Sequence, residues 1–231
     1  LSKLDENLHL VPGNYFVIGG RPSAGKTALS LQLAAGMAKQ GKRVCYFSLE
    51  TDPATLQARL IANQLYAPLS AVKNKTLSIN ELDRLADMKR WPLYIRSAAG
   101  KGVAWIKAQA LRMKADIIFV DYLQLIHERG SSDRYNAITE ISIALHELAQ
   151  TTGILVVALA QLNRNAARAE PSNADLRESG QIEQDADAIL LLSADGDTYF
   201  SRLTKNKEGR VGNAGLEFDK MTQRFTCVTA N

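Results

Sequence analysis

Eight consecutive residues near the start of the chain have the types and spacing needed to bind phosphate groups. They match the phosphate-loop pattern at every required position: Gly20, Arg21, Pro22, Ser23, Ala24, Gly25, Lys26 and Thr27. Glycines allow successive backbone N–H groups to surround a phosphate, and the helix expected after the loop directs its positive end at the same charge. Lys26 is placed to reach the β and γ oxygens of a nucleotide, and the Thr27 hydroxyl to ligate Mg²⁺. The segment therefore predicts a site for ATP, or another nucleoside triphosphate, together with Mg²⁺.

Two carboxylates and one amide follow apolar runs and are candidates to complete this site. Asp121 comes directly after the run 117–120, where a carboxylate can face Mg²⁺ beside the phosphate loop. Many phosphate-loop ATPases carry the catalytic glutamate at the next position, where this chain has Tyr122. Glu50 is the predicted replacement, because it ends the run 47–50 and ligands bind at the carboxyl ends of parallel strands. By the same geometry, we expect the amide of Gln161 to sense the γ-phosphate.

Apolar runs that alternate with helical patterns are expected to position these residues. Strands are predicted at 15–18, 43–49, 93–95, 117–120, 154–160 and 188–192, and helices at 26–39, 53–65, 78–90, 103–114 and 134–150. Asp52 is a predicted N-cap, and Ser78 with Glu81 a predicted capping box. Three later runs, at 200–204, 215–218 and 225–228, have no helices between them and indicate antiparallel strands at one sheet edge. The sequence thus predicts an α/β fold with a mostly parallel, twisted sheet flanked by helices.

The composition is that of an ordinary soluble domain without membrane or disulfide signals. Of the 231 residues, 46% are hydrophobic and 23% are charged, and the net charge of +4 permits nucleic-acid binding without arguing for it. No apolar run approaches the roughly 20 residues that span a bilayer, and no signal peptide opens the chain. Cys45 and Cys227 lie in apolar runs and are predicted to be buried free thiols. The polar stretches 127–133 and 165–173 are expected to be mobile.

Several motifs together resemble those of the DnaB-family replicative DNA helicases. They are the phosphate loop, Phe-Ser-Leu-Glu (47–50), Val-Asp-Tyr-Leu-Gln-Leu-Ile (120–126) and Gln-Leu-Asn-Arg (161–164). The most specific is Asp-Leu-Arg-Glu-Ser-Gly-Gln-Ile-Glu-Gln-Asp-Ala-Asp (175–187). The resemblance extends from about residue 10 to residue 226 and implies a RecA-like P-loop NTPase fold. It implies a linker remnant at 1–10, a motor domain at 11–231, and a family N-terminal domain that this chain does not contain.

The resemblance also implies an ATP-dependent DNA helicase that assembles as a ring of identical subunits. Members of the family form hexamers, hydrolyse nucleotide between subunits and move 5′ to 3′ along single-stranded DNA, with primase and a helicase loader as implied partners. The positions matched to DNA phosphate contacts are Arg164, Arg177, Glu178 through its main chain, and Gly180. A motor must hold DNA regardless of sequence, and arginines with exposed N–H groups suit a grip on the backbone. The expected setting is the cytoplasm of a bacterial or phage-infected cell.

One position departs from the family pattern. In the family, a basic residue and an arginine two positions later reach the neighbouring subunit's nucleotide from a late strand. Here Lys205 and Lys207 occupy those positions. A lysine supplies positive charge to a γ-phosphate but not a bidentate fork. Lys207 is the predicted finger, with Arg210 as its substitute and weak hydrolysis as the third alternative.

Two other functions fit parts of the sequence. A recombinase-like, DNA-dependent ATPase would share the ATPase core, but the motif at 175–187 and the lack of a helix-hairpin-helix module argue against it. A nucleotide-switched assembly or loading factor would bind ATP without sustained turnover, and the lysine at position 207 keeps that alternative open. Ring or filament assembly, and turnover with DNA and Mg²⁺, distinguish the three functions.

Overall fold

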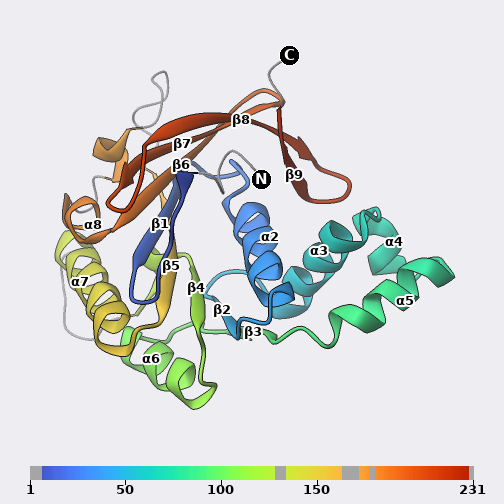
Figure 1. Ribbon diagram of the computed structural model, residues 1–231, viewed down its shortest axis with the longest axis horizontal. Coiled ribbons are helices and arrows are strands. Elements are labelled where there is room, and N and C mark those ends of the chain that lie inside the picture. The colour runs from blue at the N-terminus through green and yellow to red at the C-terminus, as the bar shows by residue number, and fades with distance from the viewer. Residues whose placement is uncertain (1–6, 128–133, 163–171, 177–179, 229–231) are drawn as a thin grey trace.

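A nine-stranded sheet organises the part of the chain that the computed structural model describes, namely residues 7–127, 134–162, 172–176 and 180–228. The strand order is β3-β2-β4-β5-β1-β6-β7-β8-β9, with β1 in the middle (Figure 1). The strands are β1 (Tyr15–Gly20), β2 (Val44–Ser48), β3 (Leu93–Ser97), β4 (Ile117–Asp121), β5 (Leu155–Gln161), β6 (Ala188–Asp195), β7 (Thr198–Asn206), β8 (Gly212–Asp219) and β9 (Arg224–Cys227). Neighbours from β3 to β6 pair in parallel, so the carboxyl ends of these strands meet at one edge.

Helices cover both faces of the parallel part of the sheet. They are α2 (Lys26–Lys39), α3 (Pro53–Leu65), α4 (Leu69–Asn74), α5 (Ile79–Met88), α6 (Val103–Arg112), α7 (Arg134–Thr152) and α8 (Gly180–Asp185). Alternate residues of β1 point to opposite faces: Phe16 and Ile18 pack with the core under α2 and α3, whereas Tyr15 and Val17 pack with the core under α6 and α7. Because the central strands are buried on both faces, their sequences are continuously apolar, as predicted.

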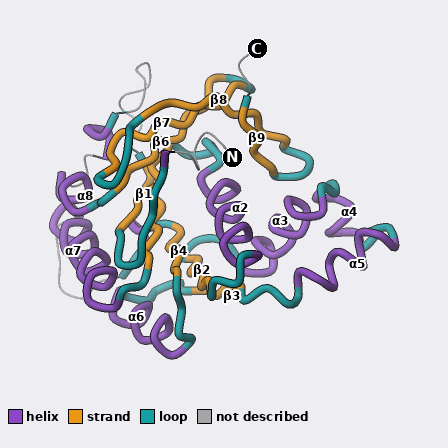
Figure 2. Tube along the Cα trace, viewed as in Figure 1, coloured by secondary structure: helices purple, strands orange, loops and turns teal. Residues whose placement is uncertain are grey.

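The predicted N-caps Asp52 and Ser78 are confirmed, with α3 beginning at Pro53 and α5 at Ile79. The Asp52 carboxylate accepts hydrogen bonds from the backbone N–H groups of Ala54 and Thr55, at 2.9 and 3.2 Å. The capping box of Ser78 and Glu81 is complete. The short helix α4 was not predicted, because its six residues are too few to show a helical period. Together α4 and α5 lie on the side of α3 away from the sheet (Figures 1 and 2).

The antiparallel extension predicted for the end of the chain is also confirmed. Strands β7, β8 and β9 follow β6 in antiparallel order, and each is somewhat longer or shifted relative to its apolar run. Its last strand returns to α2, where the side chain of Gln32 pairs with the backbone of Phe225. The Gln32 amide nitrogen donates to the Phe225 carbonyl at 2.9 Å, and its oxygen accepts from the Phe225 N–H at 2.9 Å. The end of the chain is thereby fastened to the helix that follows the phosphate loop.

Both cysteines are free, but only one matches its prediction. Cys45 is buried in β2, whereas Cys227 is partly exposed at the end of the edge strand β9, so the prediction of a buried thiol was wrong there. Among the described residues, no helix has both the length and the apolar character needed to cross a bilayer. Most of the stretches expected to be mobile, 127–133 and 165–173, lie outside the described residues.

Candidate nucleotide-binding site

The phosphate loop connects the end of β1 to the start of α2, as its sequence predicts. Gly25 precedes the helix with φ of +90°, a left-handed conformation that favours glycine. A Cβ atom at Gly25 would also lie 2.6 Å from Cζ of Phe225, and one at Gly20 would lie 2.9 Å from the carbonyl oxygen of Leu192. Gly25 is therefore required both by the turn and by its close approach to β9, and Gly20 by its close approach to β6.

Lys26 lies beneath this loop with 9% of its surface exposed. Its Nζ donates to the carbonyl oxygens of Gly20 at 2.7 Å and Arg21 at 2.9 Å, so the ammonium group is held inside the loop. Burial lowers the pKa of Lys26 to about 8, while the negative charges of Asp121 and Glu50 oppose this shift. A buried ammonium group of this kind gains most from an incoming anion, because that anion replaces the hydration that folding removed.

Asp121 is joined to the phosphate loop by a short hydrogen-bonded chain. Its Oδ2 accepts from Thr27 Oγ1 and from the Tyr46 hydroxyl, both at 2.9 Å, and the Tyr46 hydroxyl lies 2.8 Å from Ser30 Oγ. Burial raises the pKa of the Asp121 carboxyl, whereas the hydrogen bonds from Thr27 and Tyr46 and the charge of Lys26 lower it. The end of β4 and the start of α2 are therefore fixed relative to one another at the carboxyl edge of the sheet.

The donor set of Thr27 and Asp121 fits Mg²⁺. A hydroxyl and a carboxylate oxygen are hard ligands, and Mg²⁺ commonly takes one or two such protein ligands and completes its shell with water and phosphate. The described residues form no cluster of three or more His, Cys, Asp or Glu side chains that could hold a metal ion by themselves. The geometry thus suits a metal ion that is bound together with a nucleotide.

Glu50 lies just beyond the end of β2, beside Asp121. Ser48 pairs with Asp121 across the sheet, and the Leu49 N–H donates to the Asp121 carbonyl at 2.8 Å. Glu50 is exposed, and its charge raises the pKa of both Lys26 and Asp121. The two carboxylates predicted from the sequence, Glu50 and Asp121, therefore lie near the same phosphate loop.

Gln161 ends β5 next to Gly20, with which it pairs across the sheet. Its backbone is held by the side chain of Gln124: Gln124 Nε2 donates to the Gln161 carbonyl at 2.9 Å, and Gln124 Oε1 accepts the Gln161 N–H at 3.0 Å. The residue that follows Gln161, Leu162, donates its N–H to the Gly20 carbonyl at 3.1 Å. The end of β5 is thereby tied both to the phosphate loop and to the segment after Asp121.

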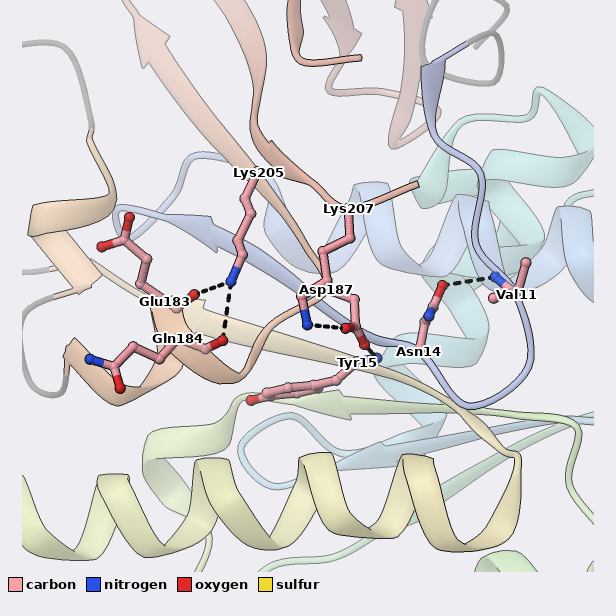
Figure 3. Close-up of polar contacts among 8 residues, drawn as sticks. All are labelled: Val11, Asn14, Tyr15, Glu183, Gln184, Asp187, Lys205 and Lys207. Carbon is pink, nitrogen blue, oxygen red and sulfur yellow. Dashed lines mark hydrogen bonds and ion pairs between the residues drawn. The ribbon is translucent and has the colours of Figure 1, made fainter. Parts of the chain in front are cut away.

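The late lysines lie at the opposite end of the parallel strands, where β1 and β6 begin. Lys205 and Lys207 are at the end of the antiparallel strand β7, beside the starts of β6 and β1 (Figure 3). Lys205 Nζ donates to the carbonyl oxygens of Glu183 at 2.5 Å and Gln184 at 3.1 Å, near the end of α8. Lys207 Nζ forms an ion pair with Asp187 at 2.7 Å. Arg210 is exposed in the turn that follows.

Three of the four predicted DNA contacts, Arg164, Arg177 and Glu178, lie outside the described residues. Gly180, the fourth, is exposed and is the first residue of α8. Sequence reasoning also missed polar residues that the fold brings to the site, above all Tyr46 and Gln124. In the sequence, Tyr46 directly precedes the motif 47–50 and Gln124 lies within the motif 120–126, but neither position reveals a hydrogen-bond partner.

A phosphate loop at the carboxyl edge of a mostly parallel sheet, with a lysine and a strand-terminal aspartate facing it, defines the class of RecA-like P-loop nucleotide-binding domains. The family model "DnaB-like helicase C terminal domain" matches residues 1–227. The chain therefore belongs to the family of DnaB-like helicase C-terminal domains.

Similar proteins and structures agree with this assignment. The chain is 35% identical over 238 residues to a "Probable plasmid replicative DNA helicase" of Chlamydia trachomatis, covering 97% of this chain and 53% of that protein. It is 36% identical over 223 residues to the "Replicative DNA helicase DnaB" of Treponema pallidum, covering 91% and 51%. The chain thus spans about half the length of the curated relatives it matches.

Two solved structures have the same fold. One is described as an ATPase domain; it superimposes with a TM-score of 0.90 at 29% identity and covers 99% of this chain and 89% of that chain. The other, a DnaB-like replicative helicase described with its interactions with primase, gives a TM-score of 0.88 at 29% identity over 97% of this chain and 60% of that chain. The expected RecA-like fold is thereby confirmed.

Proposed function

We propose that this chain is the motor domain of a replicative DNA helicase that hydrolyses ATP with Mg²⁺ and moves 5′ to 3′ along single-stranded DNA. The observation that carries the proposed ATP hydrolysis is the hydrogen bond of 2.9 Å between Thr27 Oγ1 and Asp121 Oδ2, beside the buried ammonium group of Lys26. Two oxygen ligands and a cation at one phosphate loop are the minimum set for holding a metal-bound triphosphate. Movement along DNA is proposed from membership of the DnaB-like family.

In this proposal, Lys26 contacts the β and γ phosphates and Thr27 with Asp121 holds Mg²⁺. Glu50 orients and activates the attacking water, since it is exposed at the carboxyl edge while Asp121 is only 5% exposed. Gln161 senses the γ-phosphate and transmits its presence to the segment that follows β5. That role is supported by the Leu162 N–H, which donates to the Gly20 carbonyl at 3.1 Å at the entrance of the phosphate loop.

Hydrolysis is proposed to occur between subunits. Lys207 shares the carboxylate of Asp187 with the backbone N–H of Tyr15, at the start of β1, whereas the phosphate loop follows the end of that strand. Six strand residues separate these points by about 17–20 Å, which is longer than a lysine side chain. Lys207, or Arg210 in its place, therefore acts on the nucleotide of a neighbouring subunit, with Lys205 contacting that same nucleotide. A half-site on each subunit requires a neighbouring copy of the chain, and a homohexameric ring is the assembly we propose.

DNA is proposed to be held through its phosphates by Arg164, Arg177, the main chain of Glu178, and Gly180. A primase and a helicase loader are the proposed protein partners, in the cytoplasm of a bacterial or phage-infected cell. The similarity to a DnaB-like helicase described with its interactions with primase supports the first of these partners.

The first test compares two variants of the complete protein in steady-state ATP turnover with and without a poly-dT strand. Lys26→Ala is expected to abolish turnover in both conditions, because the triphosphate loses the buried cation of the loop. Arg177→Ala is expected to keep basal turnover and to lose stimulation by DNA. Sustained DNA stimulation in the Arg177 variant would remove the role assigned to that residue.

The second test separates a helicase from its alternatives. Unwinding of a forked duplex is expected only when the single-stranded tail allows 5′ to 3′ movement, and electron microscopy with an ATP analogue and poly-dT is expected to show rings. Filaments would indicate the recombinase-like enzyme, and nucleotide binding without turnover would indicate an assembly switch; either result rejects the proposed function.

A further inference from the structure

Asp187 connects the starts of β1 and β6 to the residue that follows β7. This end of the sheet is opposite the end that carries the phosphate loop. Asp187 immediately precedes β6, and its backbone N–H donates to the Tyr15 carbonyl at 2.8 Å, while its carbonyl oxygen accepts the Lys207 N–H at 2.9 Å. Its carboxylate accepts the Tyr15 N–H through Oδ2 at 2.8 Å and the Lys207 ammonium group through Oδ1 at 2.7 Å. Figure 3 shows the carboxylate between the start of β1 and the Lys207 side chain.

The backbone contacts of Asp187 hold its carboxylate in place independently of the Lys207 ammonium group. The aspartate side chain is 13% exposed, and the bond to the Tyr15 N–H anchors one oxygen on the central strand of the sheet. A charge fixed on a rigid strand can orient a flexible lysine without having to be ordered itself. The Lys207 side chain remains 47% exposed, and this bond uses one of the three N–H groups of its ammonium.

We propose that Asp187 is a positioning residue for Lys207, and that it holds the ammonium group at the sheet edge where the nucleotide of a neighbouring subunit would approach. This inference rests on the proposed function, in which Lys207 acts between subunits. The remaining N–H groups of the ammonium can bind a phosphate oxygen while the first stays on Asp187. A lysine at this position lacks the rigid fork of an arginine, so an aspartate that restricts its motion compensates for part of that loss.

Lys205 is held in a different way. It donates to two carbonyl oxygens near the end of α8, so no fixed anion contacts it in the described bonds. Burial and the nearby charge of Lys207 lower the pKa of Lys205, whereas the charges of Asp187, Glu183 and Asp185 oppose this shift. The two lysines are therefore not equivalent: the charge of Asp187 acts on both, but its direct hydrogen bond goes to Lys207, the one at the position of the family's arginine.

An ordinary surface ion pair, between the turn before β7 and the turn after β8, offers a matched comparison. Lys220 and Asp197 are also 2.7 Å apart, but their side chains are 65% and 90% exposed, and no backbone N–H is among the described bonds made by the Asp197 carboxylate. Pairs of this exposed kind contribute little. Asp197→Asn is thus the control, because it breaks an exposed Asp–Lys ion pair that has no proposed role in hydrolysis.

The test is a double-mutant cycle on DNA-stimulated ATP turnover by the complete protein. Asp187→Asn keeps the side-chain size but leaves one oxygen to serve both Tyr15 and Lys207. It is expected to lower kcat about tenfold, as for a misplaced catalytic group, and to change the KM for ATP by less than about twofold. Lys207→Ala is expected to lower kcat about 100-fold, less than the loss of an arginine finger. The double variant is expected to match Lys207→Ala within about twofold, because Asp187 acts through Lys207.

Two further variants distinguish positioning from general stability. Asp187→Glu restores the charge and both acceptor oxygens and is expected to recover part of kcat, whereas Asp197→Asn is expected to have unchanged turnover. A kcat for Asp187→Asn that equals or exceeds the wild-type value would overturn the inference. So would losses that multiply in the double variant, since they would mean that Asp187 acts independently of Lys207.

The same set of variants separates this inference from the proposed function. Lys26→Ala with wild-type turnover would reject the ATPase function itself, and Lys207→Ala with wild-type turnover would reject the finger role and the inference together. Loss of turnover in both of these variants, combined with full turnover in Asp187→Asn, would reject only the positioning role of Asp187.

Discussion

The pKa of Lys26 leads to a quantitative prediction for nucleotide binding. Burial lowers this pKa to about 8, against the opposing charges of Asp121 and Glu50. Bound phosphate favours the charged ammonium, so affinity is complete below pH 8 and is lost as the pH rises through that value. At about pH 9, roughly one Lys26 in eleven is protonated, and the Kd for an ATP analogue is expected to be about tenfold weaker than at about pH 7. A lysine with its ordinary pKa would give almost no change in this range.

Calorimetry tests this expectation directly, with a non-hydrolysable ATP analogue and Mg²⁺ at pH 7, 8 and 9. Near pH 8, binding is expected to take up about half a proton per site, which is detected by repeating the titration in buffers of different ionisation enthalpy. Lys39→Met removes an exposed lysine from the last turn of the same helix and should keep the full pH dependence. Lys26→Arg keeps its charge throughout and should bind with a flat profile, whatever its affinity.

Two results would refute the reasoning. A wild-type Kd that is constant from pH 7 to pH 9 would mean that Lys26 stays charged despite its burial. A pH dependence that persists in Lys26→Arg would mean that another group titrates. Either result would show that the protonation of Lys26 does not control the affinity for the nucleotide in this pH range.

Three further predictions concern the residues around Lys26. Tyr46→Phe removes a buried hydroxyl that donates to the Asp121 carboxylate. It should lower the free energy of unfolding by about 2 kcal/mol and the Tm by about 4–8 °C in calorimetric scans. Tyr199→Phe is the control and should change the free energy of unfolding by less than about 0.5 kcal/mol. Gly25→Ala forces a methyl group toward the Phe225 ring at positive φ and should cost about 1–3 kcal/mol in urea unfolding; a variant of wild-type stability would show that β9 moves aside at no cost. Asp121→Asn should raise the Mg²⁺ concentration for half-maximal turnover about tenfold or more, and an unchanged Mg²⁺ titration would exclude Asp121 as a ligand.

The phosphate loop was predictable because its information is local. The pattern at 20–27 specifies the turn, the glycine conformations and the start of α2 within eight residues. Asp121 and Glu50 needed one further step, that parallel strands end at a common edge, and the pairing of Ser48 with Asp121 confirms that their strands are neighbours. The fold class followed from the same alternation of apolar runs and helical patterns.

The partners that hold these residues could not be predicted, because they are distant in sequence. Tyr46 meets Asp121 across 75 residues, and Tyr15 meets Asp187 across 172. Nothing local in a strand tells which of its side chains will be opposite a carboxylate on another strand. The close approach of Phe225 to Gly25 is of the same kind, since it depends on the position of the last strand in the sheet order.

The position of β1 explains why the proposed site needs a second subunit. This strand carries the phosphate loop at its carboxyl end and the anchor for Asp187 at its amino end. It is fully buried between β5 and β6, and its length is therefore a rigid spacer between the nucleotide site and Lys207. No rotation of a lysine side chain spans that distance, and bending the central strand would disrupt both cores. A cation from β7 can thus complete a nucleotide site only on another copy of the chain, and in the proposed mechanism the fold itself makes hydrolysis dependent on assembly.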